Sequence, residues 1–420
     1  MAEKIIRDPV HDVIAFSLDR PTDALLFQLL NAAEFQRLRR IRQLGMANMA
    51  YPGADHSRYS HSVGVMETAR KILHQLTRSF TISEQDITAC LAAALLHDLG
   101  HGPFSHVFER VSGVDHEDLT RLVILDSSTE VNQILSRHDS TLPQLVVNLL
   151  NGDCPRKFLC DILSSQLDAD RLDYLLRDNL MTGSQYGNYD LSWLLHALTI
   201  DEPTQRLAVT WKGVSAVEAY LQSRYHMYRN VYFHKVVRSG EGMLRLALQR
   251  AKRLAVQGRL TWPREENPVY QSLMGLKLDV AEFADLDDVS VLHCFKLWTD
   301  SEDPVLANLC RGLLHRRLFK TIDLQRFSDK SQIDQILAQI SDAMISADAE
   351  PAYEMFYDEP TDLPYQVSGL FVKDNHGKLR EFSTLSPMVE SLGGQLFFKR
   401  LHVAAQWREL AQKVVNATVI

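Results

Sequence analysis

Histidines are concentrated in two short segments of this 420-residue chain, and the residues beside them suggest a site for a metal ion. Residues 51–65 read YPGADHSRYSHSVGV, and residues 95–106 read LLHDLGHGPFSH. A lone histidine is usually a hydrogen-bonded core residue. A structural role in the core is a weaker explanation for several such residues in one part of the chain. The set is His61, His97, Asp98, His101, His106 and His116.

Imidazole and carboxylate together suit divalent transition metals, and the carboxylate favours an open octahedral site over a closed structural zinc site. His97 and Asp98 follow the apolar run Ala89–Leu96, which predicts a buried helix. At the end of that helix both side chains can turn toward one point, and Gly100 lets the chain bend around it. The sequence thus predicts ligands from both histidine segments.

A further ligand is expected from Ser164–Asp178, SSQLDADRLDYLLRD. Its aspartates could instead form the solvated face of an amphipathic helix, paired with Arg171 and Arg177. Asp168 and Asp170, however, stand where the helix should begin, and carboxylates there can turn into a cleft. We select Asp170.

A metal with open positions can polarise a phosphoryl oxygen and deliver a hydroxide. Arginine forks match phosphate oxygens. The candidate phosphate-binding cations are Arg58, Arg171, Arg224 and Lys235. Each alone would be an ordinary surface charge, and only their convergence in one pocket would form a phosphate site.

Helical periodicity dominates the elements that must position these residues. Residues 1–330 are predicted to form a helical body and residues 331–420 a small α+β lobe, so the fold class is mainly α. Gly213–Val256 is predicted as one long helix with a kink near Gly240 and Gly242. Hairpins are predicted at Leu207–Trp211 and around the turn at residues 374–377, where Gln366–Val372 and Lys378–Phe382 are the two strands.

Composition bounds the partners and the location. The net charge of −8 gives no indication of nucleic-acid binding. No run approaches a membrane span or a secretory leader, so no membrane partner is expected. The five cysteines form no CxxC pair, which predicts reduced thiols. A cytoplasmic protein is therefore expected.

The motifs, taken in order, resemble the HD-domain phosphohydrolases, and most closely the deoxynucleoside triphosphate triphosphohydrolases of the sterile-alpha-motif-and-HD-domain type and their bacterial relatives. The matching segments are DPVHD (8–12), FQRLRRIRQLG (35–45), residues 51–65 and 95–106, DHE (115–117), LDADRLDYLLRD (167–178) and YRNVYFHK (228–235). The resemblance implies an HD-type helical core and hydrolysis of dNTPs at the α-phosphorus to deoxynucleoside and triphosphate. It places the metal ligands on His61, His97, Asp98 and Asp170. The ion is divalent, with manganese, iron, nickel, zinc and magnesium all compatible, and a second magnesium would accompany the nucleotide.

The resemblance also assigns the catalytic and substrate-binding positions. His116 matches the histidine that protonates the leaving sugar oxygen, and Glu109 replaces the aspartate beside it. His101 and His106 match residues that contact the phosphates, and His101 is counted in the catalytic set. The remaining substrate-binding positions are Gln43, Leu44, Arg58, Arg171, Tyr174, Asp178, Arg224, Tyr228 and Tyr232.

Regulation is implied as well, because relatives assemble as homotetramers with nucleotides between subunits. Gln36 and Arg39 match a guanine-reading pocket, whereas Asn31 and Arg7 depart from it. Arg316 and Lys320 match the phosphate-binding pair of the neighbouring regulatory site. We expect a homotetramer with a dNTP or NTP activator and a weakened or lost guanine requirement; a tetramer that needs no activator fits equally.

Two alternatives stay open at this stage. The same metal site would serve a phosphatase or phosphodiesterase that acts on another nucleotide or oligonucleotide. A non-enzymatic nucleotide-sensing scaffold could also inherit the fold.

Overall fold

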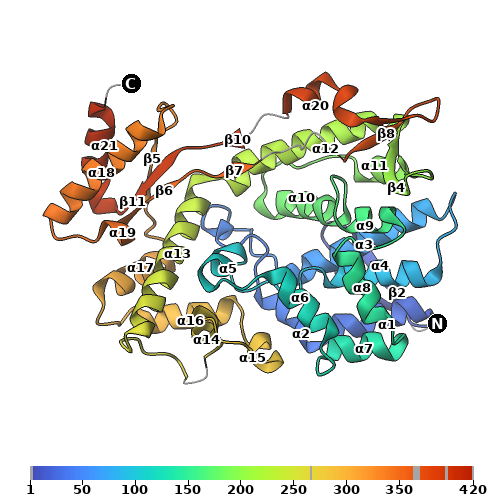
Figure 1. Ribbon diagram of the computed structural model, residues 1–420, viewed down its shortest axis with the longest axis horizontal. Helices are drawn as coiled ribbons and strands as arrows, with labels where there is room; N and C mark the ends of the chain where they lie inside the picture. The colour runs from blue at the N-terminus through green and yellow to red at the C-terminus, as the bar shows by residue number, and fades with distance from the viewer. Residues whose placement is uncertain (1–2, 265–266, 363–368, 393–395, 419–420) are drawn as a thin grey trace.

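The computed structural model describes residues 3–264, 267–362, 369–392 and 396–418, and helices make up most of it (Figure 1). A small antiparallel hairpin, β1 (Glu3–Asp8) and β2 (Asp12–Ser17), precedes the helices. The predicted fold class, mainly α with small sheet regions, is confirmed.

Three helices form the centre of the helical body: α3 (Arg58–Leu76), α4 (Glu84–Leu96) and α10 (Ala169–Thr182). The α4 helix is buried along its apolar half, and Ser83 caps its start by accepting from the Asp86 amide. Asp168 caps α10 in the same way, and Gly183 ends α10 in the left-handed conformation. Both α4 and α10 pack against α3, so the predicted metal-binding segments come together.

The other helices of the body surround this centre. Asp115 caps α6 by accepting from the backbone amides of Glu117 and Asp118, and Pro21 begins α1. Their bounds are α1 (Pro21–Asn31), α2 (Ala33–Gln36), α5 (His106–Ser112), α6 (His116–Leu125), α7 (Glu130–His138), α8 (Leu142–Leu150), α9 (Lys157–Leu163) and α11 (Leu191–His196).

The long helix predicted over 213–256 is wrong, because the chain breaks between α12 (Val214–Met227) and α13 (Lys235–Val256). A π turn at Tyr228–Tyr232 follows α12, and His234 caps α13 by accepting from the Val236 amide. The glycines expected to bend the helix serve packing instead. A side chain at Gly242 would overlap the ring of Phe356, so glycine is needed there for close approach rather than for a kink.

A second hydrophobic core forms around α13, whose neighbouring helices lie at the lower left of Figure 1. It is built from α13 and α5 together with α14 (Pro268–Leu273), α16 (Asp288–Trp298) and α17 (Pro304–Leu314). The short α15 (Val280–Ala284) instead contributes Phe283 to the core of the helical body.

A third, separate core belongs to the C-terminal lobe, where a three-stranded sheet in the order β5–β11–β6 carries α18 and α21. The bounds are β5 (Lys320–Asp323), α18 (Lys330–Ser346), α19 (Pro351–Glu354), β6 (Met355–Asp358), β11 (Arg400–Val403) and α21 (Arg408–Ala417). A short pair, β7 (Thr361–Asp362) and β10 (Leu396–Phe397), extends from it.

Strands from the two sides of the predicted boundary at residue 330 pair with each other in two places. The β5 strand precedes it yet belongs to the C-terminal sheet. The hairpin of β8 (Phe371–Lys373) and β9 (Leu379–Glu381), followed by α20 (Pro387–Leu392), returns to the helical body. There β8 pairs in parallel with β4 (Arg206–Thr210), which forms the predicted hairpin with β3 (Leu198–Asp201). The domain boundary at 330 stays a prediction. The hairpin around 374–377 is present, although its predicted start at 366–368 lies outside the described residues.

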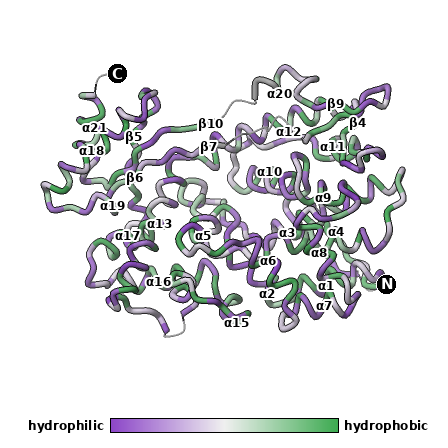
Figure 2. The backbone as a smooth tube through the Cα atoms, viewed as in Figure 1, coloured by the Kyte–Doolittle hydropathy of each residue, from purple (hydrophilic) through white to green (hydrophobic). Residues whose placement is uncertain are grey.

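Cys154 and Cys160 lie beside each other with their sulfurs in contact, and the expectation of reduced thiols stays a prediction. The turn into α9 brings these two residues together, a proximity that their spacing of six residues does not announce. Cys90, Cys294 and Cys310 are free and buried, as packing residues should be. Hydrophobic and hydrophilic segments alternate in short runs along the chain (Figure 2), and no described helix is long and apolar enough to cross a membrane.

Candidate metal centre and adjoining cavities

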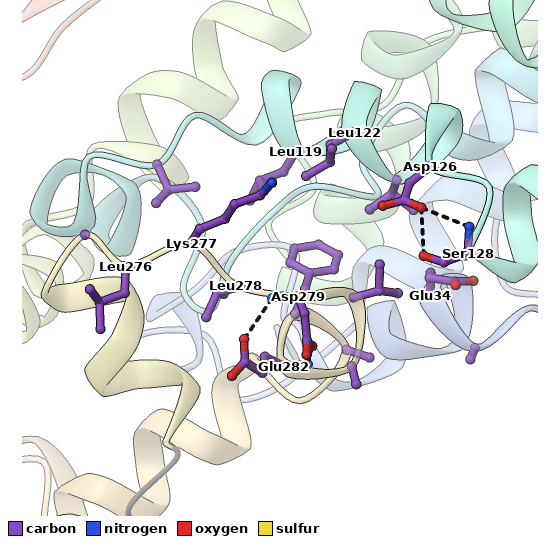
Figure 3. A pocket seen from close by; sticks show the side chains of 18 residues that line it. Glu34, Leu119, Leu122, Asp126, Ser128, Leu276, Lys277, Leu278, Asp279 and Glu282 are labelled. Carbon is purple, nitrogen blue, oxygen red and sulfur yellow. Dashed lines mark hydrogen bonds between the residues drawn. The ribbon is translucent and has the colours of Figure 1, made fainter.

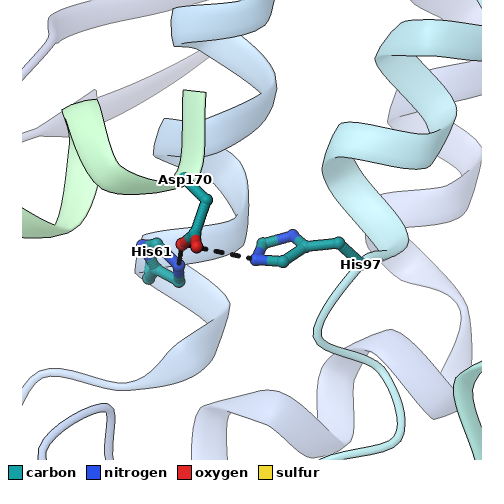
Figure 4. A group of neighbouring side chains, drawn as sticks. All are labelled: His61, His97 and Asp170. Carbon is teal, nitrogen blue, oxygen red and sulfur yellow. Dashed lines mark ion pairs between the residues drawn. The ribbon is translucent and has the colours of Figure 1, made fainter. Parts of the chain in front are cut away.

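His61, His97 and Asp170 converge from α3, the end of α4 and the first turn of α10 (Figure 4). One ligand atom from each lies within 4.8 Å of the others. The Asp170 carboxylate lies between the imidazoles, 2.9 Å from Nε2 of His61 and 3.7 Å from Nε2 of His97. These three predicted ligands therefore face one point.

Asp98 borders the same point but has other partners as well. Its carboxylate lies 3.4 Å from Nε2 of His97 and 3.8 Å from Nε2 of His61. It also pairs with the Arg58 guanidinium and lies 3.2 Å from Nε2 of His101. Its role as a ligand stays a prediction, because joining the ion would require sharing the carboxylate with Arg58.

The donor set fits a divalent cation. Burial opposes charge on His61, yet hydrogen bonds to Asp170 and Asp173 raise its pKa to about 10. Burial likewise opposes charge on Asp170, and the two histidines outweigh it and lower the pKa of that carboxyl. Nε2 of His97 is buried without a hydrogen-bond partner. An orphaned imidazole nitrogen beside an ionised carboxylate is what a cation would complete.

His116 stands beside this centre in a cluster of its own. Its Nδ1 donates to the Glu109 carboxylate at 3.2 Å, and its ring stacks on His101 at 4.0 Å. Burial and the nearby Arg58 guanidinium hold the pKa of His101 well below its usual range. His106 also contacts Glu109, at 3.2 Å. Glu109, which replaces the aspartate expected at this position, therefore still contacts His116.

Two cavities meet at this place. One, of about 370 Å³, is lined by the metal-binding group together with His101, His106 and His116. The other, of about 440 Å³, runs past Leu44, Tyr228 and Tyr232. Both are lined by Gln43, Arg58, His106, Asp170 and Tyr174. Because they share these lining residues, the two cavities adjoin each other.

Tyrosines and a fixed carboxylate shape the second cavity. The Tyr232 hydroxyl donates to Asp178 at 2.8 Å, and Nε2 of His56 contacts the same carboxylate at 2.8 Å. The rings of Tyr174 and Tyr232 meet edge to face at 6.2 Å. His56, whose part the sequence left unassigned, therefore orients Asp178.

The predicted phosphate-binding cations are only partly brought together. Arg58 lines both cavities, and Arg171, which pairs with Asp168, lines the second. Arg224 is buried beside Tyr228 and is not among the residues lining either cavity. Lys235 lies elsewhere.

The residues assigned to regulation lie outside this site. Gln36 accepts from Arg39 at 2.8 Å, and the Arg39 guanidinium lies over the ring of Tyr59. Arg316 and Lys320 line a small cavity of about 230 Å³ that is rich in positive charge; its other basic residues are Lys235 and Arg408.

A wider cavity of about 1060 Å³ lies between α6 and the segment that leads into α15 (Figure 3). Leu119, Leu122, Leu278 and other apolar side chains make up most of its wall. None of the candidate metal-ligating groups of the described residues lies on it. The chemistry therefore belongs to the smaller, polar cavities.

Sequence reasoning missed residues that act through tertiary contacts. Asp173 contacts Nδ1 of His61 at 2.8 Å and Nε2 of His11 at 2.8 Å. Arg110, Arg238 and Glu241 line the far end of the second cavity. Two motifs offered a signal in the sequence: DPVHD, which contains His11, and LDADRLDYLLRD, which contains Asp173.

Comparison with known proteins agrees with this geometry. A family model described as HD domain matches residues 58–175, and one described as HD associated region matches residues 189–259. The uncharacterized protein YwfO of Bacillus subtilis is 38% identical over 94% of this chain and 90% of its own length. The deoxynucleoside triphosphate triphosphohydrolase SAMHD1 of Danio rerio is 26% identical over 76% of this chain, which spans 55% of that protein. A crystal structure of a phosphohydrolase from Bacteroides thetaiotaomicron superposes with a TM-score of 0.82 at 29% identity, covering 96% of this chain and all of that one.

Proposed function

The chain belongs to the HD-domain phosphohydrolase family, and from this premise we propose that it hydrolyses dNTPs at the α-phosphorus. The products would be a deoxynucleoside and intact triphosphate. Similarity to the dNTP triphosphohydrolases supports this substrate class.

One observation carries the proposal: the cavity with the metal-binding group and the cavity with the tyrosine wall share lining residues. A nucleotide has a matching division, because its phosphates are anionic whereas its sugar ring and flat base can pack against aromatic side chains. With the sugar against Tyr174, the first phosphate would lie near Asp170 and Arg58. The α-phosphorus would then lie beside the metal-binding group.

A divalent ion held by His61, His97 and Asp170, with Asp98 sharing its carboxylate, would supply Lewis-acid activation of phosphate and water. The chain's own residues supply the proton. The Glu109 carboxylate accepts from Nδ1 of His116 and so fixes the ring. Nε2 of His116 is then free to hold the proton that the leaving sugar oxygen needs, a contribution of roughly 10²–10⁴ in rate.

Selection of the sugar falls to the second cavity. Asp178 keeps acceptor capacity after binding His56 and the Tyr232 hydroxyl, so it can accept from a sugar 3′-hydroxyl. Gln43 lines both cavities, and its amide can donate to the oxygen of the same hydroxyl. Leu44 and the tyrosine rings would then exclude a 2′-hydroxyl.

Assembly and control complete the proposal. A nucleotide-activated homotetramer in the cytoplasm agrees with the basic cavity around Arg316 and Lys320, which suits an anionic phosphate chain. Gln36 and Arg39 stand apart from that cavity and would belong to a separate, adjacent part of the regulatory site. Asn31 carries a carboxamide rather than a carboxylate, and its amide nitrogen donates to the Phe27 carbonyl. It therefore lacks the second acceptor oxygen that a carboxylate would offer to guanine.

The test is product identification. The protein is incubated with Mn²⁺ and each dNTP or NTP, and the products are separated by anion exchange. We expect triphosphate and deoxynucleoside from dNTPs, none from NTPs, and at least a hundredfold loss in His116→Ala. Pyrophosphate or single phosphate as product, or equal turnover of NTPs, would instead favour a phosphatase or phosphodiesterase. An inactive wild-type chain that still binds nucleotide would favour a sensing scaffold.

A further inference from the structure

Behind the metal-facing group lies a fully buried network of charged residues that the proposed reaction does not use. The Asp173 carboxylate, on α10, has no exposed surface and accepts four hydrogen bonds. His61 and His11 each contact it at 2.8 Å, one at either oxygen. Arg177 reaches both oxygens with Nε and Nη2, also at 2.8 Å. Asp173 is therefore held on every side.

The protons in this network can be assigned from its partners. An ammonium group only donates, so Nδ1 of His11, which lies 3.2 Å from the Lys71 ammonium, must accept. Nε2 of His11 then carries the hydrogen and donates to Asp173. An ionised carboxylate only accepts, so Nδ1 of His61 must donate to Asp173. That leaves Nε2 of His61, which faces Asp170, as the atom able to bind a cation.

The N-terminal hairpin supplies two of these partners. The turn between β1 and β2 carries Asp8, which pairs with Arg177 at 2.8 Å, and His11. Asp8 also accepts from the His11 amide at 2.9 Å, which fixes the shape of the turn. Although Ile5, Pro9 and Val13 of the hairpin are exposed, the side chains of Asp8 and His11 are buried against α3 and α10.

A glycine gives independent support. Gly64 lies within α3, where glycine ordinarily weakens a helix relative to alanine. A side chain there would overlap the Asp173 carboxylate and the Arg177 guanidinium. The position therefore keeps space for this network.

We propose that Asp173, held by Arg177 and by His11 of the N-terminal turn, is a positioning residue that fixes the tautomer and orientation of His61 for the metal. The inference rests on the metal site of the proposed function. Carboxylates behind metal-binding histidines typically change metal affinity by about 10–100-fold. The turn at residues 8–11 is thus part of the metal site although it lies outside the cavity.

The experiment measures Mn²⁺ affinity, by paramagnetic resonance of the free ion, and thermal stability on the same full-length variants. We expect Asp173→Asn to weaken binding by roughly 10–100-fold. His11→Leu, which loses the donor to Asp173, should weaken it by several-fold. His11→Gln should restore most of the affinity, because its amide donates from nearly the same place.

Asp303→Asn is the matched control, since Asp303 is a buried carboxylate paired with Arg250 at 2.7 Å and does not line the metal cavity. It should lose stability while binding Mn²⁺ like the wild type. Should Asp173→Asn fail to fold, the His11 pair decides, and Gly64→Ala should weaken binding as well.

The outcomes separate this inference from the proposed function. If the wild type binds Mn²⁺, and His11→Leu and His11→Gln bind it with equal affinity, the positioning role alone is overturned. Absence of wild-type binding would overturn the metal site and this inference with it. The bound Co²⁺ absorption spectrum gives a second readout, and we expect it to change in His11→Leu and to stay unchanged in Asp303→Asn.

Discussion

Metal binding should displace a proton from His61, and the size of this effect follows from the geometry of the site. In the metal-free protein Nε2 of His61 lies 2.9 Å from Asp170, and Nδ1 lies 2.8 Å from Asp173. Burial opposes the charge, but these hydrogen bonds raise the pKa to about 10. A cation at Nε2 must take the place of that proton.

The magnitude can be worked out for pH 7.5. With a pKa of about 10, only roughly 0.3% of His61 is deprotonated at that pH. The apparent affinity is then about 300-fold below its limit and rises about tenfold per pH unit between pH 6.5 and 8.5. His97, whose pKa is also raised, by the carboxylates of Asp98 and Asp170 against burial, adds to the slope.

The sign for folding is the opposite of that for metal binding. Because the pKa of His61 is raised above its ordinary 6.5, protonation stabilises the metal-free fold. That stabilisation is fully present below pH 6.5 and is lost as the pH rises through about 10.

The assay is calorimetric titration with Mn²⁺ at pH 7.5 in two buffers of different ionisation enthalpy. We expect about one proton or more released per ion, together with tighter binding at higher pH. Release of no proton, or affinity independent of pH, would refute the reasoning.

Three further outcomes are expected. Tyr232→Phe removes the hydroxyl that donates to Asp178, and steady-state kinetics should show kcat/KM for dNTPs falling roughly tenfold with weaker discrimination against NTPs; an unchanged ratio would count against the sugar assignment. Glu109→Gln should lower kcat by about 10–100-fold without changing Mn²⁺ affinity, because the amide no longer stabilises charge on His116; wild-type kcat would exclude that role. Arg316→Ala should leave the rate without activator unchanged and remove activation by added nucleotide; activation that persists would place the regulatory site elsewhere.

The centre of the site could be predicted from the sequence, because its residues lie in local motifs. His97 and Asp98 follow a buried apolar run, and the aspartate at residue 170 falls in the first turn of α10, where it can face inward. The residue at which α3 begins could not be predicted from the sequence. The polar residues before Gly64 conceal a helix that begins at Arg58, and His61 is therefore held on a helix rather than a loop.

Contacts between distant segments could not be predicted, because no local pattern announces them. His56 pairs with Asp178 across 122 positions, and His11 with Asp173 across 162. The break after Met227 was misplaced for a related reason. Glycine in a helix indicates either bending or close packing, and only the position of Phe356 decides between them at Gly242.

One cation should lie among side chains from α3, α4 and α10. We would locate it by anomalous scattering from a crystal grown with Mn²⁺ and a non-hydrolysable dNTP. We expect a strong peak within bonding distance of His61, His97 and Asp170, with the α-phosphate beside it. A peak only at the group of His106, Glu109 and His116, which could also hold an ion, or a nucleotide bound away from these side chains, would contradict it.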